Sequence, residues 1–179
     1  MSDKEEILSL IADCTKNNRK AQELLYRRTY AFAIRIALRY TRSEADAADI
    51  LSQAYIKAFR SIHSFNIEKG NFFSWLKRII INEAIDFYKA IKQHAEIEKQ
   101  NEISISVSNQ AISSIAADEI MRTISKLPPA THAVFVMYAI DGYNHREIAT
   151  ILNISEGTSK WHLNQARSLL QKRLLPKLK

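Results

Sequence analysis

The stretch Gly142–Leu170, GYNHREIATILNISEGTSKWHLNQARSLL, decides the fold of the second half of the chain. Asn144 and Glu147 have the spacing of a capping box, in which each side chain accepts a backbone N–H at the start of a helix. Asn153 tolerates the left-handed conformation that ends a helix, and Ser155 is a good cap for the next one. We therefore expect a short helix, a tight turn and a longer helix. The apolar residues of the short helix, expected to face inward, are Ile148, Ile151 and Leu152.

The longer helix has one apolar face and one polar, basic face. The apolar face, expected to be buried, consists of Leu163, Ala166, Leu170 and Leu174. Trp161 lies directly opposite. Such a face suits a helix in a DNA major groove, where polar and basic side chains reach base edges and phosphates and a ring meets thymine methyl groups. The alternative is that Trp161 packs against the other half of the protein or against a partner. The residues around Trp161 on this face and its shoulders are Thr158, Lys160, His162, Asn164, Gln165, Arg167, Ser168 and Lys172.

The composition favours helices throughout. Of the 179 residues, 46% are hydrophobic, and there are only three glycines and three prolines, so we predict an all-α protein. Cys14 is the only cysteine, which excludes an internal disulfide and a multi-thiolate metal site. No apolar run approaches the roughly 20 residues of a membrane span, and the start does not resemble a secretion signal. We expect a cytoplasmic protein.

Charge and polarity divide the chain into three parts. The 26 basic and 19 acidic residues give a net charge of +7. Residues 1–92 carry 16 basic and 11 acidic residues, residues 93–119 carry one and five, and residues 120–179 carry nine and three. Two basic blocks around an acidic one suit a protein that touches a polyanion at two places, although such an excess is also common on ordinary surfaces.

The domain prediction follows from this division. Residues 1–92 are expected to form consecutive helices with breaks near residues 17–18, 41–43 and 66–71. Residues 93–115 are polar, acidic and rich in Ser, Asn and Gln, which is typical of a flexible linker, and ISISVS within them hints at an extended segment. Residues 116–179 are expected to form a tetrahelical helix-turn-helix domain. In it, Pro128 and Pro129 stop one helix and Gly142 ends another.

One helix in the first half shows a mixed outer face. Asp49, Gln53, Ile56 and Arg60 lie opposite its apolar residues, with Ser52 at the edge. An exposed isoleucine among charged and amide groups is typical of a protein interface, although single exposed apolar residues are also ordinary. The inward residues are Ile50, Leu51, Ala54, Ala58 and Ile62.

A second candidate site follows, in SFNIEKGNFFSWLKRIIINEAIDFYKAIK. The mixture of aromatic, amide and cationic side chains suits unpaired bases, which stack on rings while phosphates meet lysine and arginine. The alternative is a capped helix with a salt-bridged surface. The loop residues are Phe65, Asn66, Lys69 and Asn71, and the polar stripe of the following helix is Asn71, Trp75, Arg78, Asn82 and Asp86, with Lys77 lying off the stripe.

These motifs together resemble the extracytoplasmic-function (ECF) sigma factors of the sigma-70 family, the promoter-reading subunits of bacterial RNA polymerase. The resemblance covers nearly the whole chain. It rests on the order and spacing of ELLYRRTYAFAIRIAL, DAADILSQAYIKAFRSIHSF, FFSWLKRIIINEAIDFYK and LPPATHAVFVMYAIDGYNHREIATILNISEGTSKWHLNQAR.

The resemblance implies roles for both halves. Residues 1–92 correspond to sigma region 2, which binds the clamp coiled coil of the largest polymerase subunit and the minus-ten element. Residues 116–179 correspond to region 4, which binds the minus-thirty-five element and the polymerase flap. An anti-sigma factor is an expected partner, often membrane-bound. The implied polymerase contacts are Asp49, Ser52, Gln53 and Ile56.

The resemblance also implies DNA contacts. The loop from Phe65 to Asn71 would receive a flipped base, and the following helix would engage the element as it melts, at a cost of a few kcal/mol per unstacked base. The implied minus-ten residues are Phe65, Asn66, Lys69, Asn71, Trp75, Lys77, Arg78 and Asn82. The implied minus-thirty-five residues are Thr158, Lys160, Trp161, His162, Gln165 and Arg167, to which the helical face itself adds Asn164 and Lys172.

This chain departs from the family pattern at several places. Ser52-Gln53 stands where Gln-Glu is usual, which removes a negative charge from the polymerase-facing helix. Ser159 stands at a buried position where an apolar residue is common, and Asn153 replaces the usual turn glycine. Trp161-His162 stands where small and basic residues are frequent.

Three other classes of function compete with this interpretation. A stand-alone DNA-binding regulator would need an effector or dimerisation domain, and an adaptor would show no salt-dependent DNA affinity. A nucleic-acid enzyme is disfavoured because no Gly-rich phosphate loop and no Ser/His/Asp set is discernible. We expect no catalysis, cofactor, metal or small-molecule substrate. The five histidines, which lack metal-ligand spacing, are His63, His94, His132, His145 and His162.

Overall fold

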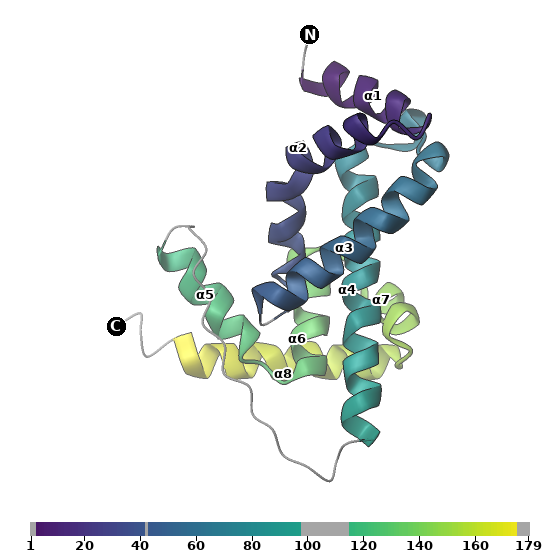
Figure 1. The fold of residues 1–179 in the computed structure, drawn as a ribbon. Helices are drawn as coiled ribbons and strands as arrows, with labels where there is room; N and C mark the ends of the chain where they lie inside the picture. The colour runs from purple at the N-terminus through teal and green to yellow at the C-terminus, as the bar shows by residue number, and fades with distance from the viewer. Residues whose placement is uncertain (1–2, 42, 98–114, 175–179) are drawn as a thin grey trace. The chain divides into compact units, whose positions relative to one another are not determined.

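The computed structural model describes residues 3–41, 43–97 and 115–174, and in these ranges all regular structure is helical (Figure 1). This confirms the all-α prediction. The α-helices are α1 (Asp3–Cys14), α2 (Arg19–Ala37), α3 (Glu44–Ser61), α4 (Phe72–Ile97), α5 (Ile115–Ser125), α6 (Pro129–Phe135), α7 (His145–Leu152) and α8 (Glu156–Leu174). Short helical turns are η1 (Ile62–Ser64), η2 (Ile67–Lys69) and η3 (Val136–Ile140).

The chain divides into two compact units. The first comprises Met1–Leu38 and Glu44–Phe87, and the second comprises Arg39–Ser43 and Tyr88–Lys179. The first therefore contains α1, α2, α3 and most of α4, and the second contains α5 to α8.

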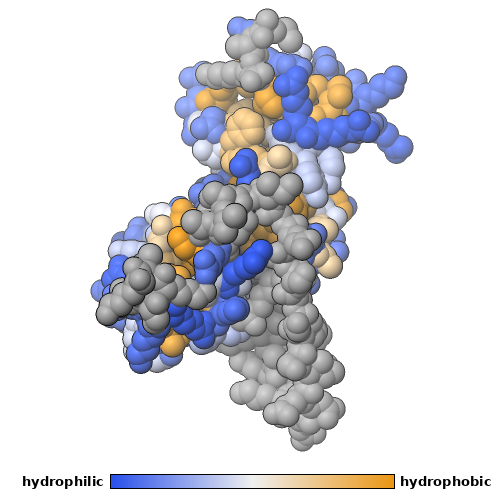
Figure 2. All heavy atoms as spheres, turned by 90° about the vertical axis from the view of Figure 1, so that its left-hand side faces the viewer, coloured by the Kyte–Doolittle hydropathy of each residue, from blue (hydrophilic) through white to orange (hydrophobic). Residues whose placement is uncertain are grey.

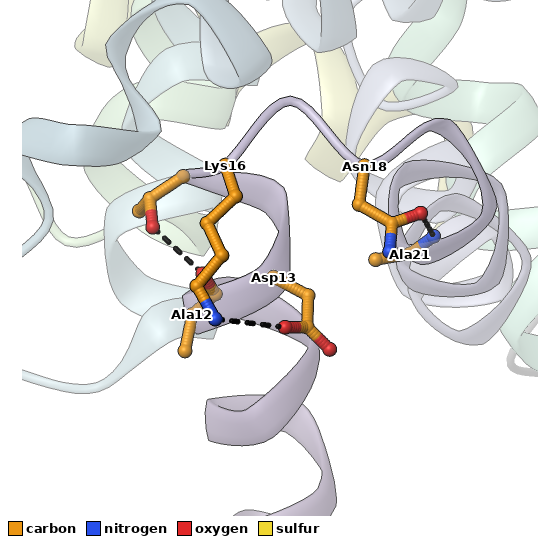
Figure 3. A network of polar contacts seen from close by, with 6 residues as sticks. Ala12, Asp13, Lys16, Asn18 and Ala21 are labelled. Carbon is orange, nitrogen blue, oxygen red and sulfur yellow. Dashed lines mark hydrogen bonds and ion pairs between the residues drawn. The ribbon is translucent and has the colours of Figure 1, made fainter.

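The turn between α1 and α2 is held by local polar contacts (Figure 3). Asn17 adopts a left-handed conformation with φ 57°, and the Asn18 side chain accepts two backbone N–H groups in the first turn of α2. Lys16 Nζ lies 3.5 Å from Asp13 Oδ1. The predicted helix break at residues 17–18 is confirmed.

The Cys14 side chain lies at the end of α1, next to this turn. Its burial, and to a lesser extent the negative charge of Asp13, raises the pKa of the Cys14 thiol to about 11.

The first unit has a core between α2 and α3, which pack against each other. Thr29 is fully buried in this core and donates to the Leu25 carbonyl oxygen at 2.7 Å. Because that bond uses the only Thr29 hydroxyl proton, the Tyr55 hydroxyl, 2.7 Å away, must donate to Thr29. Burial raises the pKa of Tyr55 to about 12. The α3 residues predicted to face inward, Ile50, Leu51, Ala54 and Ala58, are all buried, as is Ile62.

An ion pair joins α3 to α4. Glu83 is buried and accepts a hydrogen bond from Lys57, whose Nζ also lies 3.8 Å from Asp86 Oδ2. The hydrogen bond to Glu83 raises the pKa of Lys57. The contact stabilises Glu83 in a position where an unpaired carboxylate would be costly.

Helix α4 continues further than the sequence indicated. It ends at Ile97, so residues 93–97 of the predicted linker are helical, and α5 begins at Ile115, the last residue of that linker. Residues 93–97 read QHAEI, and adding good helix formers to an established helix costs little. The rest of the predicted linker, residues 98–114 with the ISISVS segment, lies outside the described residues.

The second unit is organised around α8, against which α5, α6 and α7 pack (Figure 1). The predicted apolar face of α8 is buried at Leu163, Ala166 and Leu170, and Leu174 is half-buried. In the short helix α7, Ile148 is fully buried and Ile151 and Leu152 are half-buried. The four-helix arrangement confirms the predicted tetrahelical helix-turn-helix domain.

The helix predicted to end at Gly142 does so, but its last turn is wider than an α-helix. Residues 136–140 form a π-helical turn, closed by a 3.0 Å hydrogen bond from the Asp141 backbone N–H to the Val136 carbonyl oxygen. Gly142 then adopts φ 81°, a conformation that favours glycine. Pro129 occupies the first turn of α6, where its missing N–H is not needed.

The helix-turn-helix caps are as predicted. The Asn144 side chain accepts the Glu147 N–H at 2.9 Å, and the Glu147 side chain accepts the Asn144 N–H at 2.8 Å. Asn153 is left-handed, with φ 53° and ψ 52°. Ser155 Oγ accepts the Thr158 N–H at 2.9 Å.

Ser159 lies on the buried face of α8, where an apolar residue is common in the family that this chain resembles. It is fully buried, and its Oγ lies 2.9 Å from His145 Nδ1 at the start of α7. The His145 ring in turn stacks on Tyr138 at 4.6 Å. The buried serine is therefore satisfied by a histidine from the neighbouring helix.

Substitutions of Asn153 test the left-handed turn between α7 and α8. Asn153→Gly is expected to leave stability unchanged or slightly raised, whereas Asn153→Val should lower it by about 1–2 kcal/mol, because a branched residue is strained at positive φ. Urea unfolding measures both. Asn164→Gly, at an exposed position inside α8, is the control and should cost about 1 kcal/mol. Equal stability of the glycine and valine variants at residue 153 would contradict the turn geometry.

Substitutions of Ser159 and His145 test the hydrogen bond between α8 and α7. Ser159→Ala leaves His145 Nδ1 without this partner and should destabilise the protein by about 1–2 kcal/mol. In the double variant Ser159→Ala with His145→Phe, part of that loss should be recovered, because no polar atom of the pair remains. Urea unfolding of the two single variants and the double variant gives the coupling energy. Strictly additive losses would show that the contact contributes nothing.

Candidate nucleic-acid interface

The outer face of α8 is open to solvent. Trp161 is 57% exposed, the largest exposed fraction among the large hydrophobic residues of the described chain. Lys160, Asn164 and Arg167 are also exposed, and their side chains make no hydrogen bond or ion pair with any described residue. Cations without a protein partner remain available to phosphate groups. The exposed members of the predicted face are Thr158, Lys160, Trp161, Asn164, Arg167 and Lys172, and His162 and Gln165 are half-buried.

Three residues of this face have partners inside the second unit. The Thr158 hydroxyl lies 2.8 Å from Ser155 Oγ, within the cap of α8. His162 Nδ1 lies 3.0 Å from the Oγ1 atom of Thr131, and the same hydroxyl donates to Gln165 Oε1 at 2.7 Å. The Trp161 and His162 rings meet edge to face at 4.9 Å. The helix therefore presents some side chains freely and others in set orientations.

Thr131 was not predicted from the sequence to belong to this site. This α6 residue is fully buried and contacts α8 residues 31 and 34 positions later in the chain. The helical pattern of α6 gave no sign of the contact, because a buried threonine usually bonds to its own helix, as Thr29 does.

The loop before α4 is held by its own asparagines. The Asn66 side-chain oxygen accepts the Glu68 N–H at 2.8 Å and caps η2. The Asn71 side-chain oxygen accepts the Ser74 N–H at 2.8 Å at the start of α4. The Lys69 side chain is exposed and makes no hydrogen bond or ion pair with any described residue. The loop thus combines fixed amides with an available cation.

Aromatic rings pack together beside this loop. Phe72 is buried, and the half-buried rings of Phe65 and Trp75 lie 5.6 Å from it. Phe65 and Trp75 lie 5.7 Å from each other. Two rings therefore retain partly exposed surface next to the loop. Further along α4, Arg78 and Asn82 are exposed and Lys77 is half-buried.

The four predicted polymerase contacts lie exposed on α3. Ile56 is 43% exposed, and Asp49 and Gln53 are exposed beside it in helical register. Ser52 is exposed too, but its hydroxyl donates to the Ala48 carbonyl oxygen at 2.9 Å. Its oxygen remains able to accept a hydrogen bond.

A further apolar surface on α2 was missed. Apolar residues reach the surface in small areas bordered by hydrophilic ones, as the face in Figure 2 shows. On α2 the exposed ones are Leu24, Tyr26 and Tyr30, and the Tyr26 ring lies 4.6 Å from Tyr55 of α3. The sequence pattern could have revealed this surface, because these three residues lie outside the buried helical stripe of α2. That stripe consists of Ala21, Leu25, Thr29, Ala33 and Ile36.

Neither a metal site nor a membrane-spanning helix is found in the described ranges. There, no three His, Cys, Asp or Glu side chains are grouped so that they could hold a metal ion. None of the described helices has both the length and the apolar character needed to cross a bilayer.

Comparison with known families matches both halves of the chain. Residues 25–93 match the model of sigma-70 region 2, and residues 117–170 match the model of sigma-70 region 4. The two models cover both candidate DNA-binding sites except Lys172, which lies two residues beyond the second match.

Similar proteins cover nearly the whole chain. The ECF RNA polymerase sigma factor SigM of Mycobacterium tuberculosis is 28% identical over 165 residues, spanning 92% of this chain and 83% of SigM. The ECF RNA polymerase sigma-E factor of Escherichia coli is 28% identical over 181 residues, spanning 93% of each. The sigma factor RpoE of Bartonella quintana, solved in complex with the anti-sigma factor NepR, shares the fold with a TM-score of 0.55 at 18% identity, over 85% of this chain and 95% of RpoE.

Sigma factors are transcription factors rather than enzymes, and the paired regions distinguish them from a stand-alone helix-turn-helix regulator. The chain belongs to the sigma-70 family: it is an ECF alternative sigma factor, which binds core RNA polymerase and promoter DNA and directs promoter-specific initiation.

Proposed function

We propose that three segments of this sigma factor have separate roles in transcription initiation. Residues 1–92 bind polymerase and the minus-ten element, residues 116–179 bind the minus-thirty-five element, and residues 93–115 connect them. The observation that carries the proposal is the open face of α8, centred on the exposed Trp161 and opposite a buried stripe. A helix held on one side and open on the other is suited to enter a major groove.

The minus-thirty-five element is read by α8. Lys160, Arg167 and Lys172 are exposed cations that meet phosphates, and Trp161 makes the apolar contact to thymine methyl groups. Asn164 faces solvent and is available to a base edge. Thr158, His162 and Gln165 complete the face.

The minus-ten element is held as a melted strand by the loop before α4. The partly exposed rings of Phe65 and Trp75 offer stacking surface, and Lys69 and Arg78 offer charge. Asn66 and Asn71 keep the loop in shape through their oxygens, which leaves their amide N–H groups as donors to a base. Lys77 and Asn82 extend the contact along α4.

Core polymerase is bound by α3. Asp49, Ser52, Gln53 and Ile56 dock on the clamp coiled coil of the largest subunit, with Ile56 as the apolar anchor. Tyr26 of α2 packs against Tyr55 on the same helix, α3. The second unit contacts the polymerase flap.

An anti-sigma factor restrains the protein in the cytoplasm, where transcription takes place. The support is the Bartonella quintana sigma factor of the same fold, which was solved with an anti-sigma factor bound. The exposed apolar residues of α2, α3 and α8 are surfaces that such a partner would cover.

Trp161→Ala tests the minus-thirty-five assignment. Transcription from cognate promoters should fall about tenfold, which corresponds to ~1.4 kcal/mol, because an apolar base contact is lost. The assay reconstitutes the protein with core polymerase and transcribes a library of upstream regions from the source genome. Thermal unfolding and co-elution with polymerase should be unchanged, since the side chain is mostly exposed.

Trp161→Phe is the matched control and should keep most of the activity, because it retains an aromatic ring. If Trp161→Ala unfolds the protein or leaves promoter use unchanged, Trp161 has a packing role and the assignment fails.

Ile56→Glu tests the polymerase contact. Co-elution with core polymerase should weaken at least about tenfold, because a carboxylate would be buried in place of an apolar anchor. Ile120→Glu, on the exposed side of α5 with 46% exposure, is the matched control and should bind normally. Equal polymerase affinity of the two variants would rule out α3 as the docking face.

A further inference from the structure

Thr131 joins two residues of the proposed reading face to the interior of the second unit. Its side chain is fully buried in α6, and its Oγ1 atom lies 2.7 Å from Gln165 Oε1 and 3.0 Å from His162 Nδ1. Both distances are those of hydrogen bonds. One hydroxyl therefore serves two side chains of α8.

The direction of each bond follows from the number of protons. A threonine hydroxyl has one proton to donate, and here it is donated to the oxygen of the Gln165 amide. The hydroxyl oxygen then accepts from His162, which must carry its proton on Nδ1. The arrangement commits the single hydroxyl proton of Thr131 to Gln165 and turns the Gln165 amide oxygen toward α6.

The orientation of Gln165 changes what its amide can read. A glutamine with both ends available pairs with adenine by accepting from N6 and donating to N7. When Oε1 is bound by Thr131, Gln165 reaches a base edge with its N–H donors only. Donors match the N7 and O6 acceptors of guanine and the O4 acceptor of thymine, and they do not satisfy the N6 donor of adenine.

We propose that Thr131 is a positioning residue for promoter recognition: it holds the Gln165 amide so that α8 presents a donor, which selects guanine or thymine over adenine at one position of the minus-thirty-five element. Thr131 does not itself touch DNA. The inference rests on the proposed role of α8, and it adds a specificity that the side chains of α8 alone do not have.

The experiment measures base preference at every position of the element. Core polymerase is reconstituted with each variant and bound to promoter DNA whose minus-thirty-five element is randomised, and the bound fraction is sequenced. Gln165→Ala identifies the position that Gln165 reads, because preference is lost there and kept elsewhere. At that position we expect the natural protein to favour guanine or thymine over adenine by about fivefold or more.

Thr131→Val removes the hydroxyl at nearly constant volume. It should raise the share of adenine at the Gln165 position at least severalfold and leave positions read by other residues unchanged. Thr131→Ser keeps the hydroxyl and should keep the natural preference, which separates positioning from packing. Thr123→Val is the matched control: this α5 threonine is also buried, but its hydroxyl donates only to the Glu119 carbonyl oxygen.

Several outcomes would overturn the inference. One is a preference for adenine at the Gln165 position in the natural protein, and another is an unchanged preference in Thr131→Val. If Gln165→Ala has no effect while Trp161→Ala still abolishes minus-thirty-five recognition, the inference fails and the proposed role of α8 stands. If neither variant affects recognition, the role of α8 fails as well.

Discussion

The burial of one side of α8 is the constraint on which the second unit depends. Leu163, Ala166 and Leu170 are removed from water by α5, α6 and α7, and each buried leucine is worth ~2 kcal/mol or more. This packing sets the rotation of the helix about its own axis. Because the rotation is set, the opposite face with Trp161 stays open, and the helix can form the centre of the core while presenting the face proposed to read DNA.

Polar contacts refine what that surface presents. Ser159 is bound by His145 on the buried side, and Thr131 binds Gln165 and His162 at the edge of the exposed side. A buried polar atom without a partner costs about 1–3 kcal/mol, so these contacts are strongly favoured once the helices have packed. The proposed recognition by α8 is therefore tied to Thr131 of α6 and His145 of α7, which contact α8 away from Trp161.

The first unit uses its polar and aromatic groups differently. The oxygens of Asn66 and Asn71 hold the loop, so the loop keeps its shape through contacts within a few residues. The rings of Phe65, Phe72 and Trp75 stabilise one another and leave part of their surface exposed. Here the alternative of a capped helix and the hypothesis of a base-binding loop are compatible, because the same asparagines that cap the helices position the aromatic residues.

The sequence by itself determined the helices, their caps and the faces that are buried. The capping box at Asn144, the left-handed turn at Asn153 and the stripe through Leu163 depend on contacts within one or two helical turns, which residue spacing specifies directly. The tertiary structure alone decided that Thr131 contacts Gln165, that His145 satisfies Ser159, and that Tyr26 of α2 packs against Tyr55 of α3. These contacts join residues on different helices. They form only when the helices have the right rotation and crossing angle. Residue spacing could not specify them, because rotation and crossing are set by the packing of the whole core.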